Sequence, residues 1–141
     1  MGSSLVDTLV MTKRLNKLRD YVGLLKTIRR EPRERFTTDP LVYGNAERYL
    51  QLAIQCLLDI GNHILADRKH REPQEYRDIV KTLGEQALLP PDLVSRLMPL
   101  VGMRNILVHD YLDIDRSKLY DALQTELEDF EEFARHVSKL L

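Results

Sequence analysis

Only one cysteine, Cys56, occurs among the 141 residues, which excludes an intrachain disulfide and a zinc site built from cysteines. No run of about 18 uninterrupted apolar residues is present, so no segment has the length of a membrane-spanning helix. The first ten residues lack the basic stretch and the apolar centre of a signal peptide. We therefore expect one globular domain over residues 1–141, located in the reducing cytoplasm and without a membrane partner.

Net charge is also nearly absent, because 21 basic residues are balanced by 22 acidic ones. This balance disfavours a protein held on nucleic acid by bulk positive charge. The charges are nevertheless separated along the chain, since residues 13–35 are mainly basic and residues 110–132 mainly acidic. Such segments are typical of solvated helix faces. Alternatively, the basic segment helps to hold a phosphate backbone while the acidic one contacts a protein partner.

Strand-like alternation of polar and apolar residues is lacking too, and the hydrophobic pattern is helical throughout. Apolar residues first recur at alternating steps of four and three, which predicts an amphipathic helix near residues 4–30 that Pro32 ends. These residues are Met11, Leu15, Leu18, Val22 and Leu25. Residues 31–38 are a polar stretch that we expect to be a linker.

A second helix is predicted over residues 40–67, with Asp39 as its N-cap and Pro40 at its first position. Apolar residues occupy two adjoining stripes of this helix. Because a helix that is apolar on two stripes packs on more than one side, we expect it to be central.

The remaining helices are predicted from prolines, caps and apolar spacing. Pro73 is expected to open a short third helix that closes near Gly84, and Pro91 to start a longer one. Pro99 falls inside this longer helix and predicts a kink or a short irregular joint. Asp115 can cap the last helix. The sequence thus predicts an all-α, up-and-down bundle of four long helices and one short helix.

One segment, R-N-I-L-V-H-D-Y at residues 104–111, places an arginine, an asparagine, a histidine and a tyrosine around apolar residues at the end of a predicted helix. Successive helical residues turn by about 100°, so Asn105 and His109 share one face. By the same rule Arg104 and His109 point about 140° apart. They can serve one site only if the helix bends between them or if a second subunit completes the pocket.

These residue types suit the cleavage of a phosphodiester bond. A histidine with a pKa near ~6.5 transfers protons at neutral pH, and an arginine binds phosphate oxygens as negative charge develops there. If the substrate is RNA, its own 2′-hydroxyl is the nucleophile, so neither a metal ion nor a cofactor is needed. Spacing alone also allows a structural interpretation, in which Arg104 pairs with a carboxylate, His109 caps a helix and Tyr111 packs at the bundle edge.

Other polar and aromatic residues have ordinary interpretations. The spacing of Asp110, Asp113 and Asp115 matches no calcium loop. We expect His63 to be a hydrogen-bonded packing residue and Cys56 to be a plain core thiol. The remaining tyrosines are interpreted as packing or edge residues: Tyr21, Tyr43, Tyr49, Tyr76 and Tyr120.

The spacing Arg104-Asn105-x3-His109-x-Tyr111 resembles the R-x4-H-x-Y signature of the HepT-like toxins, which are helical ribonucleases of the HEPN superfamily. Residues 47–64 resemble the central helix of that family, and residues 89–104 resemble its approach to the signature. The resemblance covers most of the chain, from the first helix to about residue 115. It implies an all-α HEPN bundle that forms a homodimer, with two Arg/His sets meeting in one cleft at or near the interface.

The same resemblance implies roles for the signature residues. Arg104 and His109 are the expected catalytic pair of a metal-independent endoribonuclease acting on RNA, with Asn105 in support. Tyr111 is the expected acceptor of adenylyl groups from a cognate minimal nucleotidyltransferase (MNT) antitoxin, which silences the enzyme. The chain is then the toxin of a type VII-like HEPN/MNT toxin–antitoxin module. The alternative is a non-catalytic helical subunit that binds a nucleotide or substrate for a nucleotidyltransferase.

Overall fold

The computed structural model describes residues 5–68, 73 and 75–141, and within these ranges the chain contains helices and no strand. The elements in chain order are α1 (Leu5–Ile28), α2 (Arg33–Thr38), α3 (Pro40–Asp67), α4 (Tyr76–Glu85), α5 (Pro91–His109), the 3-10 helix η1 (Tyr111–Asp113) and α6 (Arg116–Ser138). The predicted all-α bundle is therefore confirmed. None of the helices in the described part of the chain is long and apolar enough to cross a membrane.

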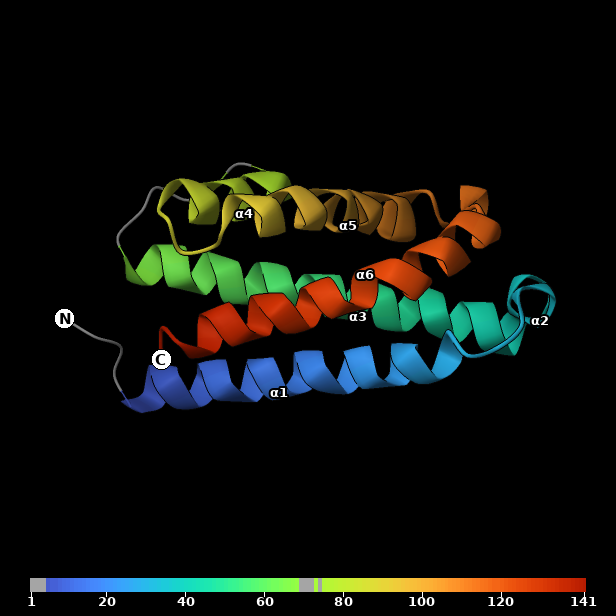
Figure 1. Ribbon diagram of the computed structural model, residues 1–141, viewed down its shortest axis with the longest axis horizontal. Helices are drawn as coiled ribbons and strands as arrows, with labels where there is room; N and C mark the ends of the chain where they lie inside the picture. Colours follow the sequence, from blue (N-terminus) through green and yellow to red (C-terminus); the bar gives the residue numbers. More distant parts are fainter. Residues whose placement is uncertain (1–4, 69–72, 74) are drawn as a thin grey trace.

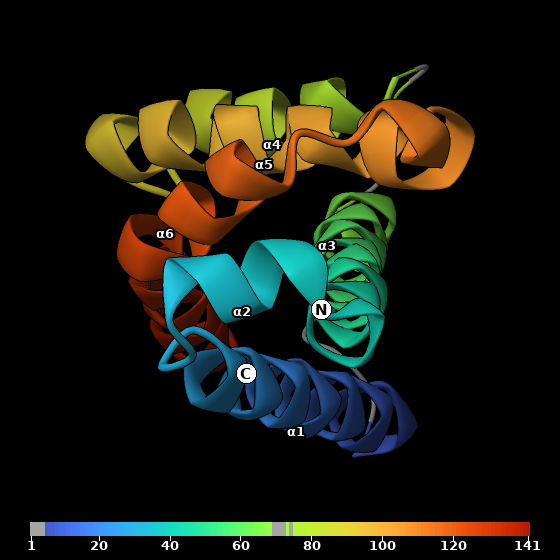
Figure 2. The same ribbon diagram turned by 90° about the vertical axis from the view of Figure 1, so that its right-hand side faces the viewer.

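The long helices α1, α3 and α6 run along one another (Figure 1), and α4 and α5 form a pair that lies across them in the view from the end of the bundle (Figure 2). Seen from the end, α2 covers the opening of the bundle between α1, α3 and α6 (Figure 2). Helix α3 contacts α1, α2, α4, α5 and α6, which confirms that it is central. Its N-cap is Asp39, whose carboxylate accepts a hydrogen bond from the backbone N–H of Leu41 at 2.9 Å, as expected.

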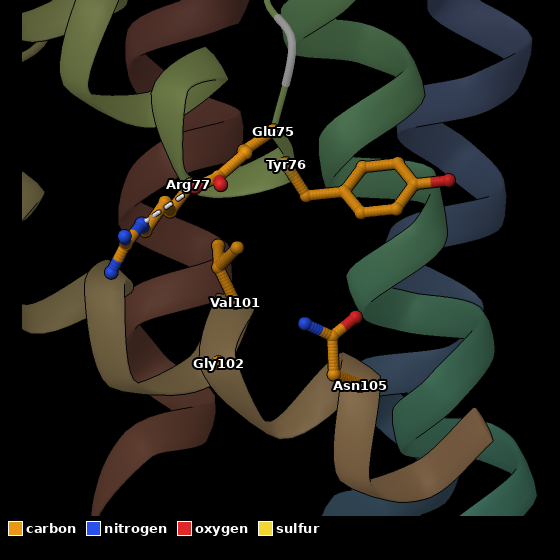
Figure 3. A pocket seen from close by; sticks show the side chains of 6 residues that line it. All are labelled: Glu75, Tyr76, Arg77, Val101, Gly102 and Asn105. Carbon is orange, nitrogen blue, oxygen red and sulfur yellow. Dashed lines mark hydrogen bonds and ion pairs between the residues drawn. The ribbon is translucent and has the colours of Figure 1, made fainter. Parts of the chain in front are cut away.

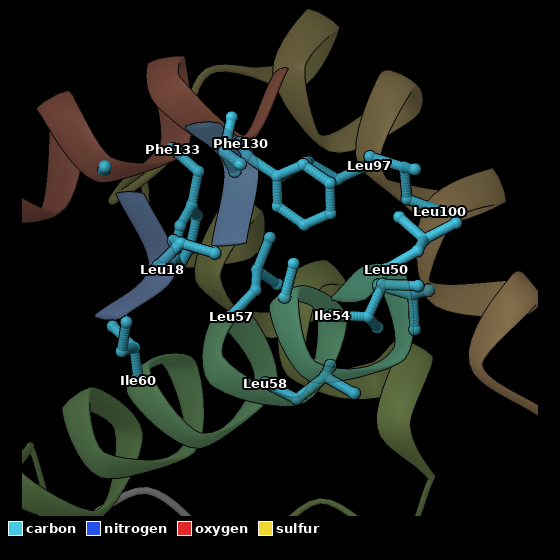
Figure 4. Packing of buried hydrophobic residues seen from close by; sticks show 14 of the residues in the cluster. Leu18, Leu50, Ile54, Leu57, Leu58, Ile60, Leu97, Leu100, Phe130 and Phe133 are labelled. Carbon is cyan, nitrogen blue, oxygen red and sulfur yellow. The ribbon is translucent and has the colours of Figure 1, made fainter. Parts of the chain in front are cut away.

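Large apolar side chains from four helices fill the centre of the bundle (Figure 4). The predicted apolar stripe of α1 is buried along its whole length. The core side chains drawn and labelled in Figure 4 come from α1, α3, α5 and α6: Leu18, Leu50, Ile54, Leu57, Leu58, Ile60, Leu97, Leu100, Phe130 and Phe133. Because α5 is anchored through this core, its C-terminal end, with residues 104–109, is held against the bundle.

The prediction of a linker over residues 31–38 was wrong, because Arg33–Thr38 forms the short helix α2. Its one apolar residue, Phe36, is fully buried and meets the ring of Tyr120 edge-on, with 5.1 Å between the ring centroids. A lone aromatic in a charged segment gives no helical periodicity, so only the packing against α6 reveals its role.

The short helix α4 begins at Tyr76 and not at Pro73. Its end is a Schellman motif, in which Leu88 N–H donates to the carbonyl of Leu83 at 2.9 Å. The residue in the left-handed position of this motif is Ala87, with φ of 57°, where glycine is the usual occupant. Pro99 lies within α5, which runs unbroken from Pro91 to His109, so the expected irregular joint is not formed.

The basic and acidic segments pair with each other across α1 and α6. Arg29 donates two hydrogen bonds to the carboxylate of Glu128, at 3.1 and 2.8 Å, and these hold the pKa of that carboxyl below its usual value. Lys26 donates one hydrogen bond from Nζ to Oε1 of Glu131. This part of the basic segment is thus engaged within the fold, a role that neither sequence interpretation included.

Candidate active site

Arg104 is half-buried on α5, and its guanidinium lies on the ring of Tyr76 at the start of α4. The central carbon of the guanidinium is 4.2 Å from the ring centroid, and Nη2 donates a hydrogen bond to the Tyr76 hydroxyl at 3.2 Å. A second, longer hydrogen bond runs from Nη1 to Oδ1 of Asn105 at 3.4 Å. The Nε atom is buried and has no hydrogen-bond partner among the described residues. Each Nη nitrogen carries two N–H groups and donates one hydrogen bond here, so two donors of the guanidinium remain for a ligand.

No carboxylate of the described residues forms an ion pair with Arg104, although other arginines of the chain are paired. Arg29 and Arg96, for example, each bind carboxylates of α6. The structural interpretation of Arg104 as half of an ion pair is therefore wrong for the described residues. An arginine held by an aromatic ring keeps its full charge available to an anion such as a phosphate.

Tyr76 is a site residue that the sequence did not indicate. It is 28 positions from Arg104 in the chain and belongs to no motif. The packing of α4 against α5 brings the two together. The interpretation of Tyr76 as a packing residue was correct, and the group that packs on its ring is the guanidinium of Arg104.

A cavity of about 480 Å³ opens beside this pair, between the start of α4 and the second half of α5. The lining residues are Glu75, Tyr76, Arg77, Val101, Gly102 and Asn105. Figure 3 shows the Tyr76 ring and the Asn105 amide along one side of the cavity and the Glu75 and Arg77 side chains on the other. Asn105 thus lies at the boundary between the cavity and the guanidinium of Arg104.

His109 is the last residue of α5 and is exposed. Within the described residues its imidazole makes no hydrogen bond, and Asp110, not His109, is the C-cap of α5. No hydrogen bond joins His109 to Arg104, and because α5 is unbroken the two side chains leave it in directions about 140° apart. One subunit therefore does not bring the predicted pair together.

Tyr111 opens the 3-10 helix that follows and is 61% exposed, while Leu112 beside it is 85% exposed. Ile106 is 44% exposed, and we call these three exposed apolar residues, all within three positions of His109 in the chain, the apolar rim. The interpretation of Tyr111 as a residue packed at the bundle edge is therefore wrong, since its ring is largely open to solvent. Its hydroxyl is accessible to a reagent.

A second stacked arginine follows the signature. The guanidinium carbon of Arg116, at the start of α6, is 3.8 Å from the ring centroid of Tyr43 on α3. Burial raises the pKa of the neighbouring Glu47, and the charge of Arg116 partly opposes this shift. Both Nε of Arg116 and Oε1 of Glu47 are buried without a hydrogen-bond partner in the described ranges. No motif or spacing in the sequence indicated this cluster.

The remaining candidates have structural roles. Asp115 caps α6 by accepting the backbone N–H of Lys118 at 3.1 Å, as predicted. Cys56 is half-buried, and burial raises the pKa of its thiol, in agreement with a plain core thiol. Across residues 5–68, 73 and 75–141, no three His, Cys, Asp or Glu side chains are grouped so that they could hold a metal ion.

Comparison with known proteins places this geometry in a family. A family model described as ribonuclease HepT-like matches residues 11–137. The tRNA nuclease HepT of Aphanizomenon flos-aquae is 27% identical over 136 residues, which are 96% of this chain and 92% of that protein. The mRNA nuclease HepT of Shewanella oneidensis is 37% identical over 84 residues, which are 60% of this chain and 63% of the relative.

Solved structures agree with the sequence matches. The tri-AMPylated HEPN toxin of Shewanella oneidensis, in complex with an MNT antitoxin, superposes with a TM-score of 0.85 at 25% identity, over 92% of this chain and 97% of that one. The cytosolic protein YutE of Bacillus subtilis has the same fold, with a TM-score of 0.83 at 22% identity over 94% and 89% of the two chains. The resemblance based on residues 104–111 is thus confirmed, and the chain belongs to the ribonuclease HepT-like family of the HEPN superfamily.

Proposed function

We propose that the chain is the toxin of a HEPN/MNT toxin–antitoxin module and cleaves RNA as a metal-independent endoribonuclease. One observation carries the proposal: Arg104, stacked on Tyr76 and without a carboxylate partner among the described residues, lies on the same helix end as the exposed imidazole of His109. Membership of a ribonuclease family supports it. In this proposal residues 1–141 form a single domain that acts in the cytoplasm, where RNA and ATP are present.

The two side chains divide the chemistry between them. A neutral His109 imidazole accepts the proton of a ribose 2′-hydroxyl, whose oxygen then attacks the adjacent phosphorus. The bond from phosphorus to the 5′-oxygen breaks, a protonated imidazole supplies the proton to that oxygen, and a 2′,3′-cyclic phosphate remains. Arg104 stabilises the negative charge that develops on the non-bridging oxygens. Asn105 supports Arg104 through the contact between its Oδ1 and Nη1.

The site is completed by a second copy of the chain. Arg104 and His109 diverge on an unbroken helix, so a guanidinium and an imidazole that converge on one phosphate come from opposite subunits of a twofold dimer. The exposed apolar rim of Ile106, Tyr111 and Leu112 lies next to His109 and is a surface that a partner copy can cover. The dimer then has a cleft at its interface, and this cleft binds the RNA.

Tyr111 is the proposed acceptor of adenylyl groups from a separate MNT antitoxin. Its exposed hydroxyl attacks the α-phosphorus of ATP, pyrophosphate leaves, and a phosphodiester to tyrosine forms. The added phosphate is an anion within the cleft of Arg104, and the attached nucleoside occupies volume that the substrate needs. Both effects exclude a substrate phosphate. The Shewanella oneidensis toxin of similar fold is described as tri-AMPylated and bound to its MNT antitoxin, which supports this assignment.

Labelled RNA incubated with the purified chain in the presence of a chelator tests the proposal. We expect cleavage by the wild type, and none by Arg104→Ala or His109→Ala variants that keep the helical circular dichroism spectrum. Cleavage that disappears with the chelator, or that both variants retain, contradicts the proposal. Nucleotide binding by a chain that cleaves no RNA would instead favour the non-catalytic subunit.

A further inference from the structure

We propose that the cavity between the start of α4 and α5 binds a purine base of the substrate RNA, the base of the nucleotide whose phosphate contacts Arg104. This inference rests on the proposed ribonuclease function and adds a base-binding subsite to it. The cavity measures about 480 Å³ and borders both Tyr76 and Asn105, the two residues that also contact the Arg104 guanidinium.

The position of the cavity relative to Arg104 is the first argument. Within a nucleotide, a single sugar joins the base to its phosphate, so a side chain that holds the phosphate confines the base to the immediate surroundings. Arg104 and Asn105 are consecutive residues, with 3.4 Å between Nη1 and Oδ1, and Asn105 lines the cavity. A phosphate on the guanidinium therefore brings the base to the mouth of this cavity.

The chemistry of the lining is the second argument. Tyr76 offers an aromatic ring, of which Arg104 covers one face; the residue lines the cavity and is 40% exposed as a whole. Unstacked RNA bases bind aromatic side chains by stacking and bind amides through their polar edges. The Asn105 amide supplies a donor and an acceptor for such an edge. Purines present the larger ring to stack, so we expect them to be preferred.

The charge of the cavity argues against an anion there. Its two charged residues, Glu75 and Arg77, are paired, with 3.0 Å between Oε2 and Nε. Val101 adds an apolar surface, and Gly102 contributes no side chain. A lining without excess charge, bordered by a ring and an amide, suits a flat neutral group. The phosphate belongs outside, on Arg104.

Gly102 allows the cavity to be filled without disturbing the core. A Cβ atom at this position meets no atom within 4 Å, and the same holds for Gly23 on α1, a helix that does not contact α4 or α5. Gly102→Leu therefore projects a side chain into the cavity, while Gly23→Leu is a matched control. Both changes replace a helical glycine with a better helix former, so neither is expected to destabilise the fold.

The first measurement is calorimetric titration with AMP, UMP and ribose 5-phosphate. We expect the wild type and Gly23→Leu to bind AMP about tenfold more tightly than ribose 5-phosphate, with UMP between them. Gly102→Leu should bind all three with the affinity of ribose 5-phosphate. Equal affinities in the wild type, or an AMP preference that survives Gly102→Leu, would overturn the base site.

The second measurement is the cleavage pattern of an end-labelled RNA of mixed sequence, in chelator. We expect purines at one position beside the cut in the wild type and in Gly23→Leu, and an even distribution with a raised KM in Gly102→Leu. An unchanged pattern in Gly102→Leu would overturn the assignment of the base to RNA, even if its AMP affinity falls. If the wild type cleaves RNA but binds AMP, UMP and ribose 5-phosphate with equal affinity, only the base site is refuted. If the wild type cleaves no RNA, the proposed ribonuclease function itself is refuted.

Discussion

A mixture of two inactive variants should regain activity if each site takes its arginine from one subunit and its histidine from the other. The variants are Arg104→Ala and His109→Ala, each purified as a homodimer. In a heterodimer of the two, one composite site lacks both groups and the other has both. The expectation follows from the unbroken helix α5, on which five residues turn the side-chain direction by about 140° and advance it by roughly 7.5 Å.

The expected recovery is large compared with the background. Loss of a positioned acid–base group lowers a rate by about 10²–10⁴-fold, and loss of a preorganised electrostatic contact by about 10²–10³-fold. Each variant alone should therefore retain about 1% of the wild-type rate or less. Random reassortment of equal amounts makes about half of the dimers heterodimers with one intact site of two, so the mixture should reach about a quarter of the wild-type rate.

The assay is the initial rate on a fluorogenic RNA in chelator, after the variants are unfolded together in urea and refolded by dilution. Native mass spectrometry verifies that heterodimers have formed. A mixture of Arg104→Ala with the doubly substituted chain is the matched control, because no heterodimer of that pair contains an intact site. If verified heterodimers stay at the background rate, the two groups act within one subunit and the reasoning from the helix geometry is refuted.

Three further predictions concern stability and are measured by urea unfolding. Glu128 has a lowered pKa in the fold because Arg29 hydrogen-bonds its carboxylate. Its contribution to stability is therefore fully present above the unfolded-state pKa of 4.5 and is lost as the pH falls through the folded-state pKa. The urea concentration at the unfolding midpoint should therefore decrease more between pH 6 and pH 3 for the wild type than for Glu128→Gln. Equal decreases in the two proteins would contradict this prediction. Ala87→Gly should raise the free energy of unfolding by about 0.5–1 kcal/mol, since it removes a left-handed alanine at φ of 57°; an unchanged or lower value shows that the position is unstrained. Phe36→Ala should lower the free energy of unfolding by about 3–5 kcal/mol, whereas exposed Glu34→Ala should change it little; equal effects would mean that α2 is not anchored by its aromatic residue.

The elements that the sequence predicted well are those with many regularly spaced apolar residues. The stripe of α1 and the two stripes of α3 are repeated local signals, and each additional turn reinforces the pattern. The cap of α3 at Asp39 is also local, since the carboxylate bonds a backbone N–H two residues away. Helix α2 was missed for the opposite reason, because its only buried residue is Phe36 and one residue has no period.

The candidate site also has a part that lies close together in the sequence and a part that forms only between helices. Arg104, Asn105, His109 and Tyr111 lie within eight positions and form a recognisable spacing. Tyr76 is 28 positions from the arginine on which it stacks, and Tyr43 is 73 positions from Arg116. No spacing rule relates residues on different helices, because their separation depends on how the helices pack.

By itself, the sequence determined the helical class, the central helix and the family, because periodicity, caps and the signature are properties of neighbouring residues. Only the tertiary structure decided which groups surround the signature arginine: an aromatic ring and an amide beside an open cavity, and no carboxylate among the described residues. It also decided that the basic residues Lys26 and Arg29 of α1 bind the acidic residues of α6. Both outcomes depend on the packing of helices that are distant in the chain, which local patterns do not encode.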